Sequence, residues 1–102
     1  MTAEKKVTKI IDADLKDIMP TFLENRQKDL NNIQQALQNK DFKSIQVIGH
    51  KLAGNAGSYG LADLGEIGAK IEMSAIKQDY DELNHLYQQF VEYMGSLEII
   101  YK

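Results

Sequence analysis

The chain contains no cysteine and few histidines. Among its 102 residues none is a cysteine and two are histidines, His50 and His85. The absence of cysteine excludes disulfides and thiolate metal sites, and it is consistent with a reducing cytoplasm. Two histidines without a third ligand near either one argue against a zinc site. The sequence therefore predicts a cytoplasmic protein that holds no metal and no other cofactor.

Long hydrophobic runs and basic clusters are also missing. The apolar runs are only a few residues long, too short for a transmembrane helix. The opening MTAEKKVTK lacks the apolar segment of a signal peptide, which argues against secretion. The net charge is −3, and lysine and arginine do not gather into the basic footprint that nucleic acid binding needs. We therefore expect neither a membrane nor a nucleic acid as partner.

The single proline marks the start of the first long helix. Pro20 suits the first turn of a helix, where its missing N–H is not needed, and the helix should run from there to about Lys40. Residues 10–19, IIDADLKDIM, could hold one or two helical turns, with Asp12 or Asp14 as N-cap. This segment would form a short N-terminal cap helix.

Three more helices follow from the spacing of apolar residues. One is expected over 42–57 with Asp41 as its N-cap, the next over about 61–76, and the last from Asp79 or Asp81 to the end of the chain. The residues expected to face the core are Phe22, Leu23, Leu30, Ile33, Leu37, Phe42, Ile45, Gly49, Leu52, Ala56, Leu61, Leu64, Gly68, Ile71, Ala75, Leu83, Leu86, Phe90, Met94, Leu97 and Tyr101. No segment shows sustained strand alternation. The sequence predicts an all-α, antiparallel four-helix bundle with a short N-terminal cap helix, in one domain over residues 1–102.

His50 lies on a predicted helix face with small side chains. At about 100° per residue, it sits about 130° from the centre of the core stripe of its helix, so it should be exposed. Its neighbours one turn away are Gln46, Val47, Ala53 and Gly54, and Gly57 lies two turns on. Bare backbone there would let another molecule approach the ring.

Spacing alone leaves a second interpretation open. His50 could be an ordinary surface histidine, and glycines in helices can serve close packing, which suffices to explain Gly49 and Gly68 on the core faces. His85 has no glycine around it and is expected to be an ordinary, partly exposed helix residue.

The stretch GHKLAGNAGSYG resembles the signature of histidine-containing phosphotransfer (HPt) domains. That signature places leucine two, lysine three, glycine four and glycine ten residues after a histidine, and this chain has His50, Leu52, Gly54 and Gly60 at the matching places. DADLKDIMPTFLENRQKDL resembles the cap and first helix of such domains, and ALQNKDFKSIQVIGHKLAG resembles their approach to the histidine. The resemblance covers essentially the whole chain.

The resemblance implies a phosphorelay carrier. His50 would accept a phosphoryl group and pass it to or from an aspartate of a response-regulator receiver domain, which supplies its own magnesium. A sensor or hybrid histidine kinase would be a further partner, and the carrier itself is expected to be a monomer. The chain has no G-x-x-x-x-G-K-[ST] loop, so it is not expected to be a kinase. The alternative is a helical docking module that binds a signalling partner through the same face without phosphotransfer.

Two supporting features come with the resemblance. The lysine of the family three residues after the histidine is Ala53 here, which leaves Lys51 and Lys43 as candidates to balance phosphate charge. In some relatives a glutamate twenty-two residues after the histidine hydrogen-bonds its ring; that position is Glu72, which could equally be a solvated boundary residue. A carboxylate on the other ring N–H would fix the tautomer of the phosphoacceptor. The receiver is expected to dock through Val47, Gln46, Gly54 and Gly57.

Overall fold

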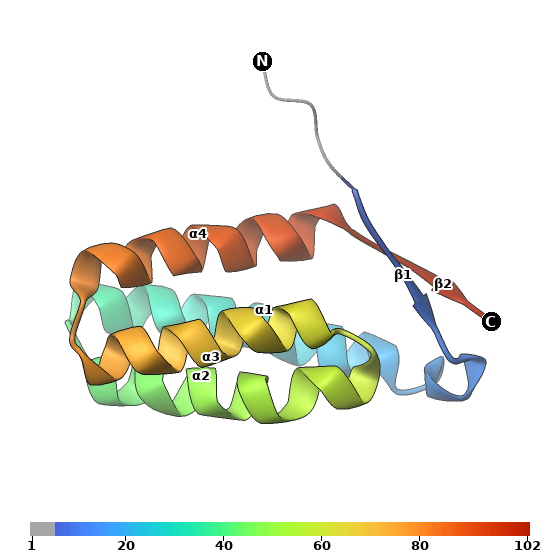
Figure 1. Cartoon of the computed structure of the whole chain (residues 1–102), viewed down its shortest axis with the longest axis horizontal. Helices are drawn as coiled ribbons and strands as arrows, with labels where there is room; N and C mark the ends of the chain where they lie inside the picture. The colour runs from blue at the N-terminus through green and yellow to red at the C-terminus, as the bar shows by residue number, and fades with distance from the viewer. Residues whose placement is uncertain (1–5) are drawn as a thin grey trace, which may run out of the picture.

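The fold is a bundle of four antiparallel helices with a pair of strands at one end (Figure 1). The computed structural model describes residues 6–102. In chain order the elements are β1 (Val7–Ile11), a 3₁₀ turn (Ala13–Leu15), α1 (Met19–Gln38), α2 (Phe42–Asn55), a second 3₁₀ turn (Ala56–Tyr59), α3 (Ala62–Ile76), α4 (Tyr80–Ser96) and β2 (Leu97–Tyr101). The predicted four-helix bundle is confirmed.

The helices begin where their capping residues predict. The carboxylate of Asp41 accepts a hydrogen bond from the N–H of Ser44 at 3.2 Å, and that of Asp79 accepts one from the N–H of Glu82 at 3.1 Å. These bonds satisfy N–H groups that have no partner in the first turn of a helix. Asp79, rather than Asp81, therefore caps α4, and Pro20 lies in the first turn of α1 as expected.

The core is built from the apolar stripes of all four helices. Every residue expected to face inward is buried or half-buried, and Ile45, Leu64 and Phe90 have no exposed surface. Ile11 and Met19 also belong to the core, although the spacing of the long helices did not point to them. The two residues lie on either side of the first 3₁₀ turn and bring the N-terminal segment against the bundle.

The prediction of a chain without strands is wrong at both ends. α4 stops at Ser96, and residues 97–101 form β2, which pairs in parallel with β1. The register runs from Val7 opposite Leu97 to Ile11 opposite Tyr101. Each strand has only five residues, too few for alternation to stand out, and both are rich in β-branched side chains that favour extended structure.

The short N-terminal cap helix is not confirmed. Residues 7–11 form a strand, and only the three-residue 3₁₀ turn Ala13–Leu15 follows. Asp12 caps that turn by accepting a hydrogen bond from the N–H of Asp14 at 2.9 Å. The predicted cap residue is therefore correct, but the helix it would open is one turn only.

Asp63 connects the strand pair to two helices. Its carboxylate lies 2.8 Å from the ammonium nitrogen of Lys9 on β1, and it accepts a 2.8 Å hydrogen bond from the hydroxyl of Tyr93 on α4. Burial acts to raise the pKa of Asp63, but the bonds from Lys9 and Tyr93 outweigh it and hold that pKa below its usual value. Burial, together with the neighbouring carboxylate, raises the pKa of the Tyr93 hydroxyl. The carboxylate thus ties β1, α3 and α4 together in its charged form.

Asp63→Asn should lower the free energy of unfolding by about 1 kcal/mol at neutral pH, because it removes the ion pair and weakens the bond to Tyr93. Since the pKa of Asp63 is lower in the folded chain than in the unfolded one, its stabilisation is complete above about pH 4 and disappears as the pH falls through the folded value. Urea unfolding of both proteins should therefore converge at low pH. Asp17→Asn, at an exposed carboxylate, is the control. A gap between Asp63→Asn and the parent that persists unchanged into acid would contradict this role.

Candidate functional site

Two glycines bring the backbones of α2 and α3 into contact. A Cβ added at Gly49 would lie 2.6 Å from the amide nitrogen of Glu72, and one added at Gly68 would lie 2.7 Å from that of Ala53. Real Cβ atoms do not approach other atoms so closely, so only glycine fits at either position. The two helices therefore touch backbone to backbone along this line.

The close approach places Glu72 against the ring of His50. The Nδ1 atom of His50 lies 2.9 Å from Oε2 of Glu72. Three-quarters of the histidine side chain is exposed, whereas only a quarter of the glutamate side chain is. His50 is exposed as predicted, and of the two alternatives left open for Glu72 the structure has the contact with the ring.

This contact decides which ring nitrogen is free. An ionised carboxylate can only accept a hydrogen bond, so Nδ1 carries the proton and donates it to Glu72. In the neutral ring Nε2 then keeps its lone pair. The ring is held by one edge and offers an unprotonated nitrogen at the other.

The glycines that follow His50 have separate tasks. A Cβ at Gly54 or Gly57 would meet nothing within 4 Å, so these two leave open space on the outer face of the helix end. Gly60 ends the second 3₁₀ turn with a left-handed backbone, at φ 81°, and a Cβ there would lie 2.6 Å from Cδ1 of Ile11. The last glycine of the motif thus shapes a turn and leaves room for β1.

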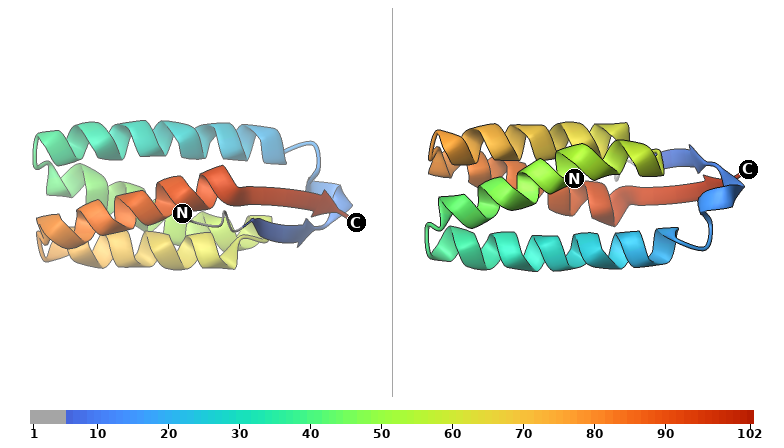
Figure 2. Two further views of the ribbon diagram at one scale, coloured as in Figure 1. Left: turned by 90° about the horizontal axis from the view of Figure 1, so that it is seen from above. Right: turned by 90° about the horizontal axis from the view of Figure 1, so that it is seen from below.

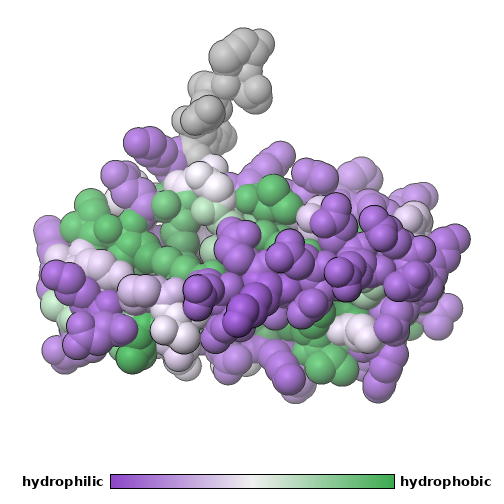
Figure 3. Space-filling model, turned by 180° about the vertical axis from the view of Figure 1, so that it is seen from behind, coloured by the Kyte–Doolittle hydropathy of each residue, from purple (hydrophilic) through white to green (hydrophobic). Residues whose placement is uncertain are grey.

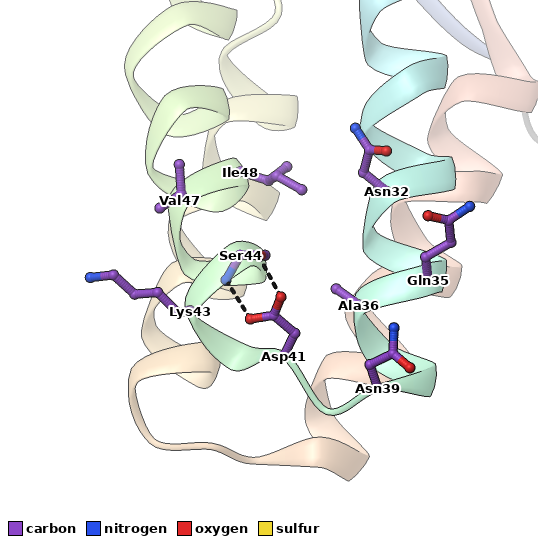
Figure 4. Close-up of a pocket in the computed structure, with 9 residues that line it drawn as sticks. All are labelled: Asn32, Gln35, Ala36, Asn39, Asp41, Lys43, Ser44, Val47 and Ile48. Atoms are coloured by element: carbon purple, nitrogen blue, oxygen red, sulfur yellow. Dashed lines mark hydrogen bonds between the residues drawn. The ribbon is translucent and has the colours of Figure 1, made fainter.

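The two candidate lysines lie on different sides of α2. Burial raises the pKa of Asp29 on α1, and the charges of Arg26 and Lys51 oppose that shift, so the charge of Lys51 acts on α1. In Figure 4 the Lys43 side chain extends away from α1, and Val47 lies one turn further along α2. Lys43 is therefore the one of the two that shares a side with the exposed Val47.

Three exposed apolar side chains lie on α2 and α3. Val47 is 40% exposed, as predicted, and Met73 and Ile76 on α3 are 54% and 53% exposed. The sequence reasoning missed Met73 and Ile76. Both lie outside the core stripe of their helix, one and four residues after Glu72. Apolar residues at such positions are the signal that could have identified them. Gln46, one turn before His50, is half-buried.

A shallow groove opens beside Val47, between α1 and α2 (Figure 4). Its volume is about 470 Å³, and its lining mixes amide, hydroxyl and apolar side chains: Asn32, Gln35, Ala36, Asn39, Asp41, Lys43, Ser44, Val47 and Ile48. His50 does not line it. The groove is therefore a feature of the surface next to the histidine and not a pocket that encloses it.

His85 has a different environment. Its Nδ1 lies 3.8 Å from a carboxylate oxygen of Glu82 on the same helix, too far for a hydrogen bond, and its side chain is 79% exposed. No residue from another helix holds the ring. Of the two histidines, only His50 is oriented by a neighbouring helix.

The family comparison agrees with this geometry. The Hpt domain family matches residues 17–97, which include all of α2 and α3. The chain belongs to the Hpt domain family. Hpt domains are histidine phosphotransfer carriers that work with response regulators and histidine kinases in two-component systems, and they are not kinases themselves.

Other comparisons add no relative. No curated protein and no solved structure matches the chain. The match to the Hpt domain leaves out β1 and all of β2 except Leu97. Within residues 6–102, no helix has the length and hydrophobicity to cross a membrane, and no three histidine or acidic side chains converge on a possible metal position.

Gly68→Ala should destabilise the Hpt domain by about 1–3 kcal/mol, because the added methyl group would force α2 and α3 apart. Gly54→Ala is the matched control, since its methyl group meets nothing and alanine is favoured over glycine in a helix by about 1 kcal/mol. Urea unfolding of both variants should give shifts of opposite sign. Equal effects would show that the α2–α3 contact does not depend on glycine at position 68.

Proposed function

We propose that His50 accepts a phosphoryl group on Nε2 from the aspartyl phosphate of a receiver domain, and returns it to an aspartate in the reverse reaction. The observation that carries this proposal is the hydrogen bond from Nδ1 to Glu72 on an otherwise exposed ring. It leaves one unprotonated nitrogen in the position that a partner can reach. A plain docking face has no need of a ring oriented in this way.

The transfer step is a direct displacement at phosphorus. The lone pair of Nε2 attacks the phosphorus atom, the N–P bond forms, and the bond from phosphorus to the aspartate oxygen breaks, so the aspartate leaves as a carboxylate. The ring becomes positively charged as this happens, because Nδ1 keeps its proton. Glu72 stabilises that charge through the existing hydrogen bond. The reverse step returns the electron pair to Nε2.

The receiver docks over the exposed side of α2 and α3. Val47 on α2, with Met73 and Ile76 on α3, supplies apolar contact near the histidine. Gly54 and Gly57 leave the space that an approaching aspartate needs. Gln46, one turn before His50 on α2, belongs to the same area, and Lys43 lies at its edge, one turn before Val47 (Figure 4).

The charge of the phosphoryl group is balanced from a distance. A phosphorylated side chain carries about two negative charges at neutral pH. Ala53 cannot offset them, the charge of Lys51 acts on Asp29 of α1, and Lys43 lies almost two turns before His50. Either lysine acts through solvent, so its influence is small and depends on salt.

His50→Gln should abolish acid-labile, base-stable labelling by a phosphorylated receiver domain, since glutamine has no nitrogen that can form the phosphoramidate. His85→Gln should label at the rate of the parent protein, because His85 lies on another face. Both variants replace exposed side chains, so circular dichroism should show an intact fold. Labelling that persists in His50→Gln would contradict the assignment. If no receiver tested labels the parent protein, the result would favour a docking module that does not transfer phosphate.

Gly54→Leu should reduce the transfer rate at least tenfold, because a large side chain would stand in the path of the receiver. Gly95→Leu on α4 is the matched control: a Cβ there also meets nothing within 4 Å, but it lies on a different helix. The measurement is the initial rate of transfer from a phosphorylated receiver domain. Equal rates for the two variants would place the receiver on another face.

The double variant Lys43→Ala, Lys51→Ala should transfer more slowly by at most about tenfold, which is what two exposed charges can supply. The difference from the parent should shrink as salt is raised from low to high concentration. The measurement is the transfer rate of the double variant and of the parent at both salt concentrations. Lys77→Ala, which removes an exposed lysine at the end of α3, is the control. A thousandfold loss would reveal a direct cation contact, and no loss would show that the site works without either lysine.

A further inference from the structure

Among residues 6–102, the strand β2 pairs with β1 along one edge and with no strand along the other. Lys102 donates its N–H to the carbonyl of Ile11 at 3.0 Å and accepts from the N–H of Ala13 at 2.9 Å, so its backbone groups face β1. Backbone groups alternate between the two edges of a strand. Those of Ile100 and Glu98 therefore also face β1, whereas those of Tyr101 and Ile99 point to the opposite edge.

The opposite edge faces α1 across an open groove. β2 lies between β1 and α1 (Figure 2), and the groove between it and α1 has a volume of about 500 Å³. It is lined by Leu23, Glu24, Gln27, Met94, Leu97, Ile99 and Tyr101. Figure 3 shows hydrophobic side chains gathered at this end of the molecule. None of the hydrogen bonds outside helices and strands among residues 6–102 engages the outer backbone groups of Ile99 or Tyr101.

We propose that β2 pairs edge to edge with β2 of a second copy of this chain, in antiparallel orientation. The two copies then share a four-stranded sheet in the order β1–β2–β2–β1. An antiparallel pair around a two-fold axis is self-complementary, because each strand offers the same donors and acceptors to the other.

The side chains of β2 specify the register of the pair. With Ile100 at the two-fold axis, Ile100 faces its counterpart, Glu98 faces Lys102 twice, and Ile99 faces Tyr101 twice. Apolar, opposite-charge and aromatic to β-branched pairs all stabilise antiparallel strands. Registers centred on Glu98 or on Lys102 would instead put like charges directly opposite one another. Among the registers whose central pair has no mutual hydrogen bonds, the one centred on Ile100 is therefore favoured.

The second copy suits this edge for a further reason. Ile100 is 43% exposed, so pairing at the axis covers apolar surface that the single chain leaves in water. The edge also lies beyond the end of α4, while His50 is on α2, which does not neighbour α4 in the bundle (Figure 1). Paired copies would keep the face of His50 open, so the pairing does not depend on the function of that face. This pairing departs from the monomer expected from the sequence.

The first test is a cross-link at the axis. Residues that face each other at the axis form a pair without mutual hydrogen bonds, with Cα atoms about 4.5 Å apart, which a disulfide can span. The chain has no cysteine, so Ile100→Cys supplies the only thiol. Mild oxidation should convert most of this variant to a covalent dimer. Ile10→Cys is the control, because it is exposed but lies about three strand spacings from its counterpart. No dimer from Ile100→Cys, or equal yields from both variants, overturns the proposal.

The second test reverses the charges. The interface is small, so self-association is expected to be weak and is measured by sedimentation up to about 1 mM protein. Glu98→Lys and Lys102→Glu should each raise the dissociation constant about tenfold, because each puts like charges opposite one another. The double variant Glu98→Lys, Lys102→Glu restores opposite charges and should return to the value of the parent. A monomeric parent throughout the range, or a double variant as weak as the single ones, overturns the proposal.

Discussion

The backbone contact between α2 and α3 is the constraint on which the rest of the site depends. Gly49 and Gly68 let the two helices approach until atoms of one backbone meet those of the other. At that distance the carboxylate of Glu72 reaches Nδ1 of His50 without either residue being buried. A larger side chain at either glycine would separate the helices, and the histidine would then be an unsupported surface residue. The close packing of α2 against α3 thus fixes the orientation of the exposed ring of His50.

The same contact explains why so many glycines surround one histidine. Gly49 and Gly68 serve the helix contact, Gly54 and Gly57 leave open surface, and Gly60 forms a turn against β1. Each glycine lowers the stability of its helix, and the close packing of α2 and α3 at Gly49 and Gly68 offsets that loss. Helix spacing alone places Gly49 and Gly68 on the core faces and Gly54 and Gly57 on the outer face, whereas the turn that Gly60 forms against β1 is not visible in that spacing.

The sequence predicts the parts of the structure that repeat over several turns. Helix faces, the capping residues Asp41 and Asp79, and the exposure of His50 follow from periodicity and local chemistry. Features that depend on residues far apart in the chain do not. β1 and β2 are separated by the whole bundle and are too short to show alternation, so α4 seemed to continue to Tyr101. The effect of the Lys51 charge on Asp29 and the bonds of Asp63 to Lys9 and Tyr93 also require the tertiary arrangement.

The central claim is that Glu72 holds Nδ1 of His50 and leaves Nε2 as the nitrogen that is phosphorylated. Nuclear magnetic resonance of the ring nitrogens of His50, before and after phosphorylation by a receiver domain, measures this directly. The account predicts a proton on Nδ1 in the free protein and phosphorus coupled to Nε2 in the phosphorylated one. A proton on Nε2 in the free protein, or a phosphoryl group on Nδ1, would contradict it.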